Sequence, residues 1–171
     1  MRSGSTALAT ERVERRLAAI LVADIAGYSR LMGADEEGTH DRVKAHFRQL
    51  IDPVLEHRGR VVKNTGDGML VEFPSVVDAV RCAAETQRAM IDRNAGIPED
   101  EHIRFRIGVH LGDVIVEPED IFGDDVNIAS RLEALAEPGG IWCSEASCHS
   151  SGCRSRQQKE SGPCCSYTQR Q

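Results

Sequence analysis

Apolar residues along the chain follow two patterns, short continuous or alternating runs typical of strands and longer runs with helical spacing. Residues 17–23 are all apolar, as expected of a strand buried on both faces, and Asp24 follows at its exit. Residues 60–64 and 69–73 are predicted to form a hairpin, because the glycines within residues 65–68 supply the positive φ that tight turns require. The first part of the chain therefore predicts one buried strand and one hairpin.

Three segments have the spacing of helices. Residues 40–57 carry an apolar stripe, with Pro53 expected to kink or break the helix. A second helix is predicted to begin after Ser75, where Asp78 is spaced for a capping-box-like start. Its expected inner face consists of Val76, Val80, Ala83, Ala84 and Ile91. The third predicted helix covers residues 127–136.

A further strand pair is predicted between the second and third helices. Apolar residues alternate over 103–109, and residues 114–116 are expected to pair with them after a turn at Gly112 and Asp113. The resulting order is strand, helix, strand, strand, helix, strand, strand, helix. This order predicts an α+β fold, a ferredoxin-like, antiparallel-rich sheet with helices packed on one face.

The character of the sequence changes after Trp142. Residues 143–171 are rich in cysteine and serine and have almost no apolar periodicity, so they are expected to be disordered and to supply neither a core strand nor an amphipathic helix. We therefore expect a disordered N-terminus over 1–11, a domain over 12–142 and a tail over 143–171. Cys82 is the one cysteine outside that tail, which is typical of a protein from a reducing compartment.

The length and net charge of the chain exclude several classes of function. The 171 residues are enough for one domain, and the net charge of -6 argues against a nucleic-acid-binding or membrane-surface protein, since both need a basic face. The apolar run at 17–23 is far shorter than the roughly 20 residues that cross a bilayer. A cytoplasmic protein without nucleic-acid or membrane partners is expected. A small anionic ligand would need a metal ion, a helix N-terminus or individually placed cations.

Two aspartates are candidate metal ligands. Asp24 ends the buried strand and Asp67 lies on the hairpin turn, so their carboxylates could converge at one edge of the sheet. Two close carboxylates repel unless a divalent cation holds both ionised, and Mg²⁺ prefers such oxygen ligands. The alternative is purely structural, with Asp24 capping the following turn and Asp67 serving as a turn residue.

Four further polar residues are candidates for ligand binding or catalysis, and each also has a purely structural interpretation. Lys63 lies on a predicted strand, where an isolated lysine is most often a solvated charge. Asn127 and Arg131 are four residues apart and share one helical face. With Asp120 they belong to one polar segment, and the alternative interpretation of this segment is a surface helix with an ion pair. Near a phosphate, Asn127 and Arg131 could orient a ribose and neutralise developing charge.

Three sequence segments together resemble a known family. They are RRLAAILVADIAGYSRLM, VKNTGDGMLVEF and FRIGVHLGDVIVEPEDIFGDDVNIASRLEALAEPGG. In this order and spacing they resemble the class III nucleotidyl cyclase catalytic domain, specifically the bacterial adenylate cyclase type. The resemblance covers about residues 12–141, and several separate motifs agree.

The resemblance implies roles for particular residues. Asp24 and Asp67 would be the metal aspartates, with the backbone carbonyl of Ile25 as a further ligand. The turn whose amides face the triphosphate would consist of Ala26, Gly27, Tyr28 and Ser29. Lys63 would donate a hydrogen bond to adenine N1, and Asp120 would accept one from the exocyclic amine of adenine. Guanine has its hydrogen-bond donor and acceptor in the opposite positions. Asn127 would orient the ribose, and Arg131 would stabilise charge on the transferred α-phosphoryl group.

The implied activity is that of an adenylate cyclase in intracellular signalling. ATP would become 3′,5′-cyclic AMP and pyrophosphate by in-line displacement with two Mg²⁺ (or Mn²⁺) ions, at sites that a homodimer shares. The family's domain continues past Ile141 with a helix, strands and a lysine that contacts the triphosphate, so the domain here is expected to be C-terminally incomplete. One alternative is therefore a catalytically degenerate cyclase-like domain that serves as a dimerisation or interaction module.

A second alternative concerns the tail. Cys143, Cys148, His149 and Cys153 are soft ligands that could hold a metal, although their spacing does not match a zinc knuckle or ribbon.

Overall fold

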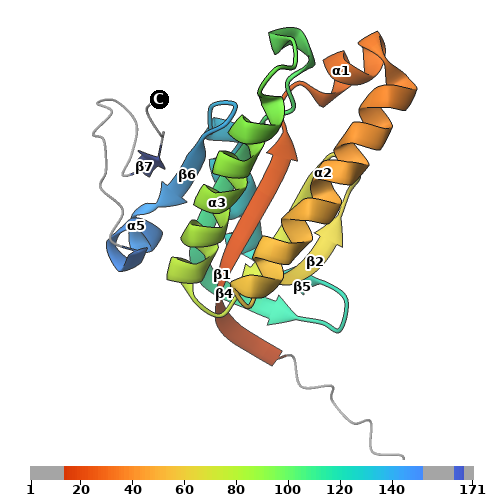
Figure 1. Cartoon of the computed structure of the whole chain (residues 1–171). Helices are drawn as coiled ribbons and strands as arrows, with labels where there is room; N and C mark the ends of the chain where they lie inside the picture. The colour runs from red at the N-terminus through yellow and green to blue at the C-terminus, as the bar shows by residue number, and fades with distance from the viewer. Residues whose placement is uncertain (1–13, 152–163, 168–171) are drawn as a thin grey trace, which may run out of the picture.

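The computed structural model describes residues 14–151 and 164–167 and consists of one antiparallel-rich sheet with helices packed on it (Figure 1). The strands are β1 (Glu14–Ile25), β2 (Arg60–Asn64), β3 (Gly68–Phe73), β4 (Phe105–Val116), β5 (Ile121–Phe122), β6 (Ile141–Ser144) and β7 (Cys164–Tyr167). The strand order is β2-β3-β1-β4-β6-β7, with β5 paired to β4. Only the β4–β6 pair is parallel. The first four strands thus have the ferredoxin-like order that the sequence predicted.

The central strand β1 is apolar on both faces. Ala19, Leu21, Ala23 and Ile25 belong to one buried cluster, while the alternate residues Ala18 and Ile20 belong to another. This alternation follows from the period of two along a strand. Each face of β1 must therefore be covered by helices, as expected of a strand buried on both sides.

The helices cover both faces of the sheet. They are α1 (Tyr28–Ala34), α2 (Glu36–Glu56), α3 (Val76–Asn94), the 3-10 turn η1 (Glu99–Glu101), α4 (Asp124–Leu135) and α5 (Glu145–Ser151). Apolar residues of α1, α2, α3 and α5 share one core with the sheet, whereas Ala129 of α4 packs with Ala18, Ile20 and Val114 on the other face. Figure 1 shows α2 and α3 lying together in front of the sheet. The prediction that the helices occupy one face is wrong, because both faces of β1 are apolar.

Three further local predictions differ from the structure at least in part. Pro53 does not break the helix, because α2 contains it and continues to Glu56, while the alternative of a kink stays a prediction. Ser75 occupies the N-cap position of α3 but makes no side-chain capping bond. Ile91, expected on the inner face of α3, is 49% exposed.

The turn expected at Gly112 and Asp113 is absent, because β4 pairs continuously with β1 as far as Val116. The chain turns later, where the Glu117 N–H donates to the Asp120 carbonyl at 2.9 Å. Gly112 has a packing role instead, since a Cβ there would lie 2.2 Å from Cγ of Asp125 on α4.

The sheet continues past the boundary expected at Trp142. Strand β6 pairs with Ile107, Gly108 and Val109 of β4, and Cys143 and Cys148 are buried in the main core. The expectation that the tail supplies no strand or helix is therefore wrong for residues 143–151 and 164–167. Pairing along the edge of β4 explains the difference, because this tertiary contact leaves no periodicity in so short a segment. The position of the domain boundary itself stays a prediction.

Some predictions fall outside the described residues. The expected disordered segment 1–11 lies there, as do residues 152–163 with Cys153. Within 14–151 and 164–167, no three His, Cys, Asp or Glu residues form a group that could hold a metal ion. In the same residues, every helix is too short or too polar to cross a membrane.

Candidate active site

Strand pairing brings Asp24 and Asp67 to the same edge of the sheet. Asp24 at the end of β1 pairs with Gly68, and the Ile25 N–H donates to the Asp67 carbonyl at 2.9 Å. Gly66 has a φ of +96°, which favours glycine in this turn. A Cβ on Gly68 would lie 2.9 Å from Thr65 Oγ1 and 3.2 Å from the Ala23 carbonyl oxygen, so the glycine allows the close approach of the turn to β1. The register thus makes the two aspartates neighbours although 43 residues separate them in sequence.

Arg106 is a third member of this site, and the sequence analysis missed it. It lies on β4 directly opposite Asp24, and its Nη2 donates to Asp24 Oδ2 at 2.8 Å. The same guanidinium forms an ion pair with Glu133 of α4, with 3.0 Å between Nε and Oε1. An arginine among the apolar residues of a strand was a signal, but only the β1–β4 register shows that it meets Asp24.

Glu133 is buried beside these charges. Burial raises the pKa of its carboxyl, Arg106 opposes this effect, and the negative charges of Asp24 and Asp67 add to the rise. Asp24, Asp67 and Glu133 therefore share one electrostatic environment in which Arg106 is the compensating cation.

The donor set fits a hard divalent cation. Asp24 and Asp67 supply carboxylate oxygens and Ile25 a backbone carbonyl, which are the ligand types that Mg²⁺ and Mn²⁺ prefer. In the described part of the chain, the half-buried Asp67 carboxylate has neither a hydrogen bond nor an ion pair. A half-buried carboxylate without a partner is suited to a cation, since burial makes an unpaired charge costly.

The turn after β1 leads directly into α1. Gly27 precedes the helix with a φ of +70°, and the Ala26 N–H donates to the Arg104 carbonyl at 2.9 Å. The Ala26 amide is therefore engaged and is not directed to a phosphate. By their position in the first turn, the amides of Tyr28 and Ser29 have no acceptor within the helix and could bind an anion.

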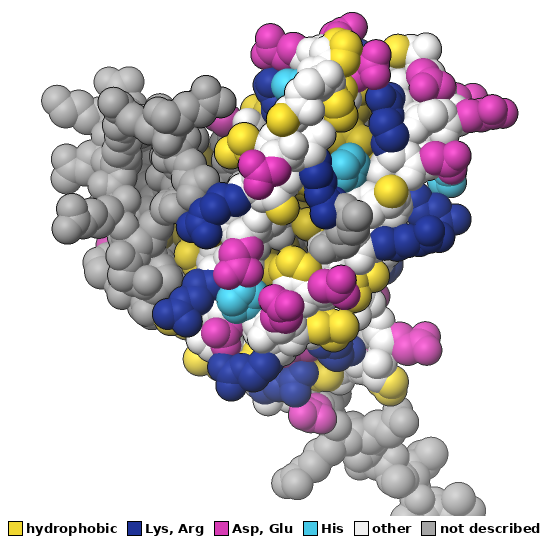
Figure 2. Space-filling view, viewed as in Figure 1, with side chains coloured by type: hydrophobic (Ala, Val, Ile, Leu, Met, Phe, Trp, Pro, Cys, Tyr) yellow, Lys and Arg dark blue, Asp and Glu magenta, His cyan; other side chains and the backbone are white. Residues whose placement is uncertain are grey.

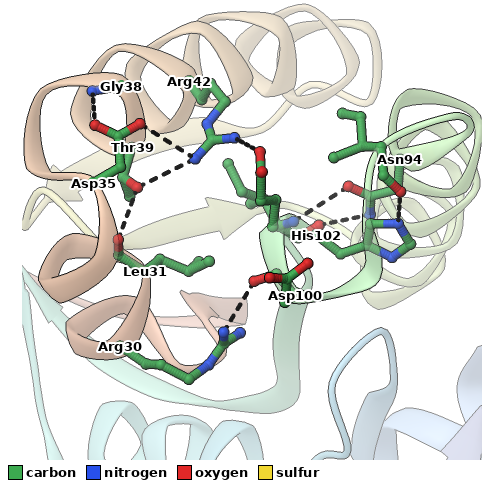
Figure 3. A network of polar contacts seen from close by, with 12 residues as sticks. Arg30, Leu31, Asp35, Gly38, Thr39, Arg42, Asn94, Asp100 and His102 are labelled. Atoms are coloured by element: carbon green, nitrogen blue, oxygen red, sulfur yellow. Dashed lines mark hydrogen bonds and ion pairs between the residues drawn. The ribbon is translucent and has the colours of Figure 1, made fainter.

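A polar network fixes α1 against the rest of the fold (Figure 3). The buried Thr39 hydroxyl donates to the Leu31 carbonyl at 3.0 Å, and Arg30 donates to the Asp100 carbonyl at 2.9 Å. Arg42 of α2 forms an ion pair with Glu101 at 2.7 Å. These contacts join α1, α2 and η1, so the turn that precedes α1 is held in position.

Lys63 and Asp120 meet although they are 57 residues apart. Lys63 Nζ lies 3.2 Å from Asp120 Oδ2, at the end of β2 and the turn before β5. Partial burial opposes ionisation of Asp120, but hydrogen bonds from the Ile121 N–H and from Lys63, with the lysine charge, lower its pKa overall. The pair predicted to read the adenine base is therefore brought together.

Asn127 and Arg131 are both exposed on α4. Within the residues that the structure describes, neither forms a hydrogen bond or ion pair with Asp24 or Asp67. Glu133 on the same helix faces Arg106 instead. One chain therefore contains the aspartate site and the Lys63–Asp120 pair, but it does not bring Asn127 and Arg131 to either aspartate.

Comparison with known proteins identifies the family. Residues 11–162 match the adenylate and guanylate cyclase catalytic domain family. A Rhizobium meliloti protein named "Putative adenylate cyclase 3" is 54% identical over 139 residues, which is 81% of this chain and 24% of that protein. An adenylate cyclase of Streptomyces coelicolor is 35% identical over 133 residues, 77% of this chain and 33% of that one. The chain thus spans a third or less of these two relatives.

A solved structure shows the same fold. The adenylate/guanylate cyclase/hydrolase from Silicibacter pomeroyi superposes with a TM-score of 0.72 at 50% identity, covering 80% of this chain and 79% of that one. The family match over residues 11–162 spans most of the chain and includes Asp24, Asp67 and Arg106. This chain therefore belongs to the family of class III nucleotidyl cyclase catalytic domains.

Proposed function

We propose that this chain is an adenylate cyclase that converts ATP to 3′,5′-cyclic AMP and pyrophosphate at sites shared by two copies of the chain. The observation that carries the proposal is the β3–β1–β4 register, which sets Asp67, Asp24 and Arg106 side by side. An edge with two carboxylates and one cation is suited to hold a metal-bound triphosphate. The names of the relatives from Rhizobium meliloti and Streptomyces coelicolor support adenylate rather than guanylate cyclase activity.

The aspartate site would bind the metal and the phosphates. Asp24, Asp67 and the Ile25 carbonyl would hold two Mg²⁺ or Mn²⁺ ions. When bound, these ions would supply the Lewis acidity that acidifies the ribose 3′-hydroxyl and offsets charge on the phosphate oxygens. The first-turn amides of α1 would bind a phosphate, and the Arg106 guanidinium lies close enough to Asp24 to donate to phosphate oxygens beside it.

The Lys63–Asp120 pair would select the base. Lys63 would donate to adenine N1, and Asp120 would accept from the exocyclic amine, whereas guanine presents a donor and an acceptor in the opposite places. The mutual contact of 3.2 Å orients both groups before a base arrives. This polarity supports ATP over GTP as the substrate.

A second copy of the chain would complete each site. Asn127 and Arg131 are exposed on α4 and, in the described residues, contact neither aspartate. A homodimer would let these side chains reach the metal site of the partner, where Asn127 would orient the ribose and Arg131 would stabilise charge on the α-phosphoryl group. Asp24 and Asp67 would then act at the site of their own chain.

The test is cyclic AMP formation by the purified full chain with ATP and Mg²⁺ or Mn²⁺, measured by mass spectrometry. Asp24→Ala and Asp67→Ala should each lower the rate at least about a hundredfold, because each removes a metal carboxylate. Asp92→Asn, on the exposed surface of α3, should leave the rate unchanged. A folded dimer that forms no cyclic AMP at high concentration would instead support a degenerate interaction module.

A further inference from the structure

One face of α2 carries a line of basic side chains. His40, Lys44 and Arg48 are spaced four residues apart, so they follow one another along the helix, and all three are exposed. In the residues that the structure describes, none of the three forms a hydrogen bond or ion pair. Figure 2 shows Lys and Arg side chains gathered at the right-hand edge of the view, where α2 runs. His40, Lys44 and Arg48 therefore form a basic stripe whose two cations, Lys44 and Arg48, are outside any ion pair in the described residues, and the exposed Asp52 follows Arg48 on the same row.

An apolar trench runs beside the basic stripe. Val43, Phe47 and Ile51, also four residues apart on α2, line the trench. Asn64 at the end of β2 and Gly66 of the β2–β3 turn line it as well. The trench has a volume of about 370 Å³. The nine described residues that line it include no carboxylate. Its floor is therefore apolar, and the only formal charges on its rim are positive.

We propose that this trench binds a small amphiphilic anion, a medium-chain carboxylate whose chain lies on the floor and whose head group meets Lys44 and Arg48. Liquid water occupies roughly 30 Å³ per molecule, so 370 Å³ accommodates about a dozen non-hydrogen atoms. Decanoate has that size. The long stems of lysine and arginine let the charged groups reach a head group while their methylenes cover the chain.

A membrane surface fits this feature less well. Adsorption to anionic lipid needs a broad basic face, whereas the chain carries a net charge of -6. Asp and Glu side chains are scattered over the face seen in Figure 2, including the tip formed by η1 and the start of α2. Other Lys and Arg side chains on this face lie among the acidic ones, whereas Lys44 and Arg48 both line the trench, which favours a discrete ligand there.

The trench adjoins the candidate active site. Gly66 on its wall precedes Asp67, and Tyr28, which also lines it, is the first residue of α1 after the turn that follows Asp24. A bound carboxylate would therefore contact both segments that position the aspartates. The expectation that decanoate changes the rate of cyclic AMP formation depends on the proposed function. The expectation that decanoate binds in the trench does not.

Binding is tested by isothermal titration of the full chain with decanoate below its micellar concentration. The double variant Lys44→Gln/Arg48→Gln should bind about tenfold more weakly, because two exposed cations no longer face the head group. The matched control Arg81→Gln/Arg88→Gln removes two exposed arginines of α3 and should bind like the wild type. Equal affinity in both double variants would overturn the proposal.

Ligand and trench variants supply independent tests. Hexanoate should bind more weakly than decanoate by up to about fourfold per missing methylene, since a buried CH₂ contributes about 0.8 kcal/mol. Ile51→Glu should abolish binding, whereas Ile91→Glu, at another exposed apolar site on α3, should not. If decanol binds as tightly as decanoate, the basic residues do not recognise the head group and the proposal is wrong. Binding to phosphatidylglycerol vesicles without binding to decanoate would also contradict it.

Discussion

Arg106 is the residue on which the charge balance of the aspartate site depends. It contacts Asp24 at 2.8 Å and the buried Glu133 at 3.0 Å, so one guanidinium compensates two carboxylates from different elements. Lysine would be a poorer replacement, because the guanidinium carries its donors on separate nitrogens of a planar fork, whereas the three donors of an ammonium share one nitrogen. The sequence showed this arginine in a strand, but its importance follows from its two partners.

We expect Arg106→Gln to destabilise the fold by about 1–3 kcal/mol, because Glu133 would be left buried without its cation. The free energy of unfolding from urea denaturation measures this loss. Arg104→Gln should change stability by no more than about 0.5 kcal/mol, since its partner Glu99 is largely exposed. Adding Glu133→Gln to Arg106→Gln should restore much of the stability. An unstable double variant would show that the guanidinium contributes mainly through packing.

The Lys63–Asp120 pair gives a prediction about pH. Partial burial opposes ionisation of Asp120, but the Ile121 N–H and Lys63 lower its pKa below the ordinary value of 3.8. A group with a lowered folded-state pKa stabilises the fold above its unfolded pKa, and this stability is lost as pH falls through the folded-state value. The stability difference between wild type and Lys63→Gln should thus be constant near neutral pH and shrink below about pH 4.

Carbon NMR titration of the Asp120 carboxyl measures the same coupling directly. In Lys63→Gln the Asp120 pKa should rise toward 3.8, whereas Lys44→Gln, which changes an exposed lysine on α2, should leave it unchanged. An unaltered Asp120 pKa in Lys63→Gln would mean that the Ile121 N–H alone lowers it.

At the scale of elements, α4 lies unusually close to β4. A Cβ on Gly108 would lie 2.4 Å from the Ala129 carbonyl oxygen and 2.4 Å from the Glu133 backbone nitrogen. Backbone atoms at that distance cannot move aside without shifting the whole helix. This close approach places Glu133 against Arg106 and leaves Asn127 and Arg131 on the outer surface.

Gly108→Ala should therefore destabilise the fold by about 3 kcal/mol, because the methyl group would push α4 away from the sheet. Thermal unfolding followed by circular dichroism measures the effect. Gly33→Ala is the matched control, because no atom lies within 4 Å of a Cβ there and the residue is helical. It should be neutral or stabilising by up to about 1 kcal/mol. Similar melting temperatures for the two variants would contradict this account of α4.

At the scale of the whole molecule, the candidate residues divide into groups that one chain does not unite. The aspartates lie at one edge of the sheet, whereas Asn127 and Arg131 lie exposed on α4. Sites shared between two chains would reconcile this separation with the proposed activity. Two copies related by a two-fold axis would form two equivalent sites, since such an interface uses the same surface on both subunits.

Mixing two inactive variants tests this arrangement. Asp24→Ala removes a residue that would bind metal in its own chain's site, and Arg131→Ala removes one that would act in the partner's site. A heterodimer of the two variants would therefore contain one intact site. An equimolar mixture after subunit exchange should recover up to about a quarter of wild-type cyclic AMP formation, because half of the dimers are mixed and each has one working site. Asp24→Ala mixed with Asp67→Ala is the control and should stay inactive. No recovery from the first mixture would exclude shared sites.

The sequence by itself determined most of the elements and the family. Its continuous apolar run gave the central strand, its glycine-rich turn gave the hairpin, and its helical stripes gave α2, α3 and α4, since these patterns are local in the chain. The motifs that contain Asp24, Asp67, Lys63 and Asp120 could also be recognised in the sequence. The prediction of a turn at Gly112 was wrong, because this glycine instead allows close packing with Asp125.

Only the tertiary structure decided which of these residues meet. Strand register set Arg106 opposite Asp24, the approach of α4 at Gly108 brought Glu133 to the same cation, and pairing with β4 drew residues 141–144 into the sheet. The physical reason is that local patterns report on burial and backbone conformation, whereas register and helix approach arise from contacts between segments far apart in the chain.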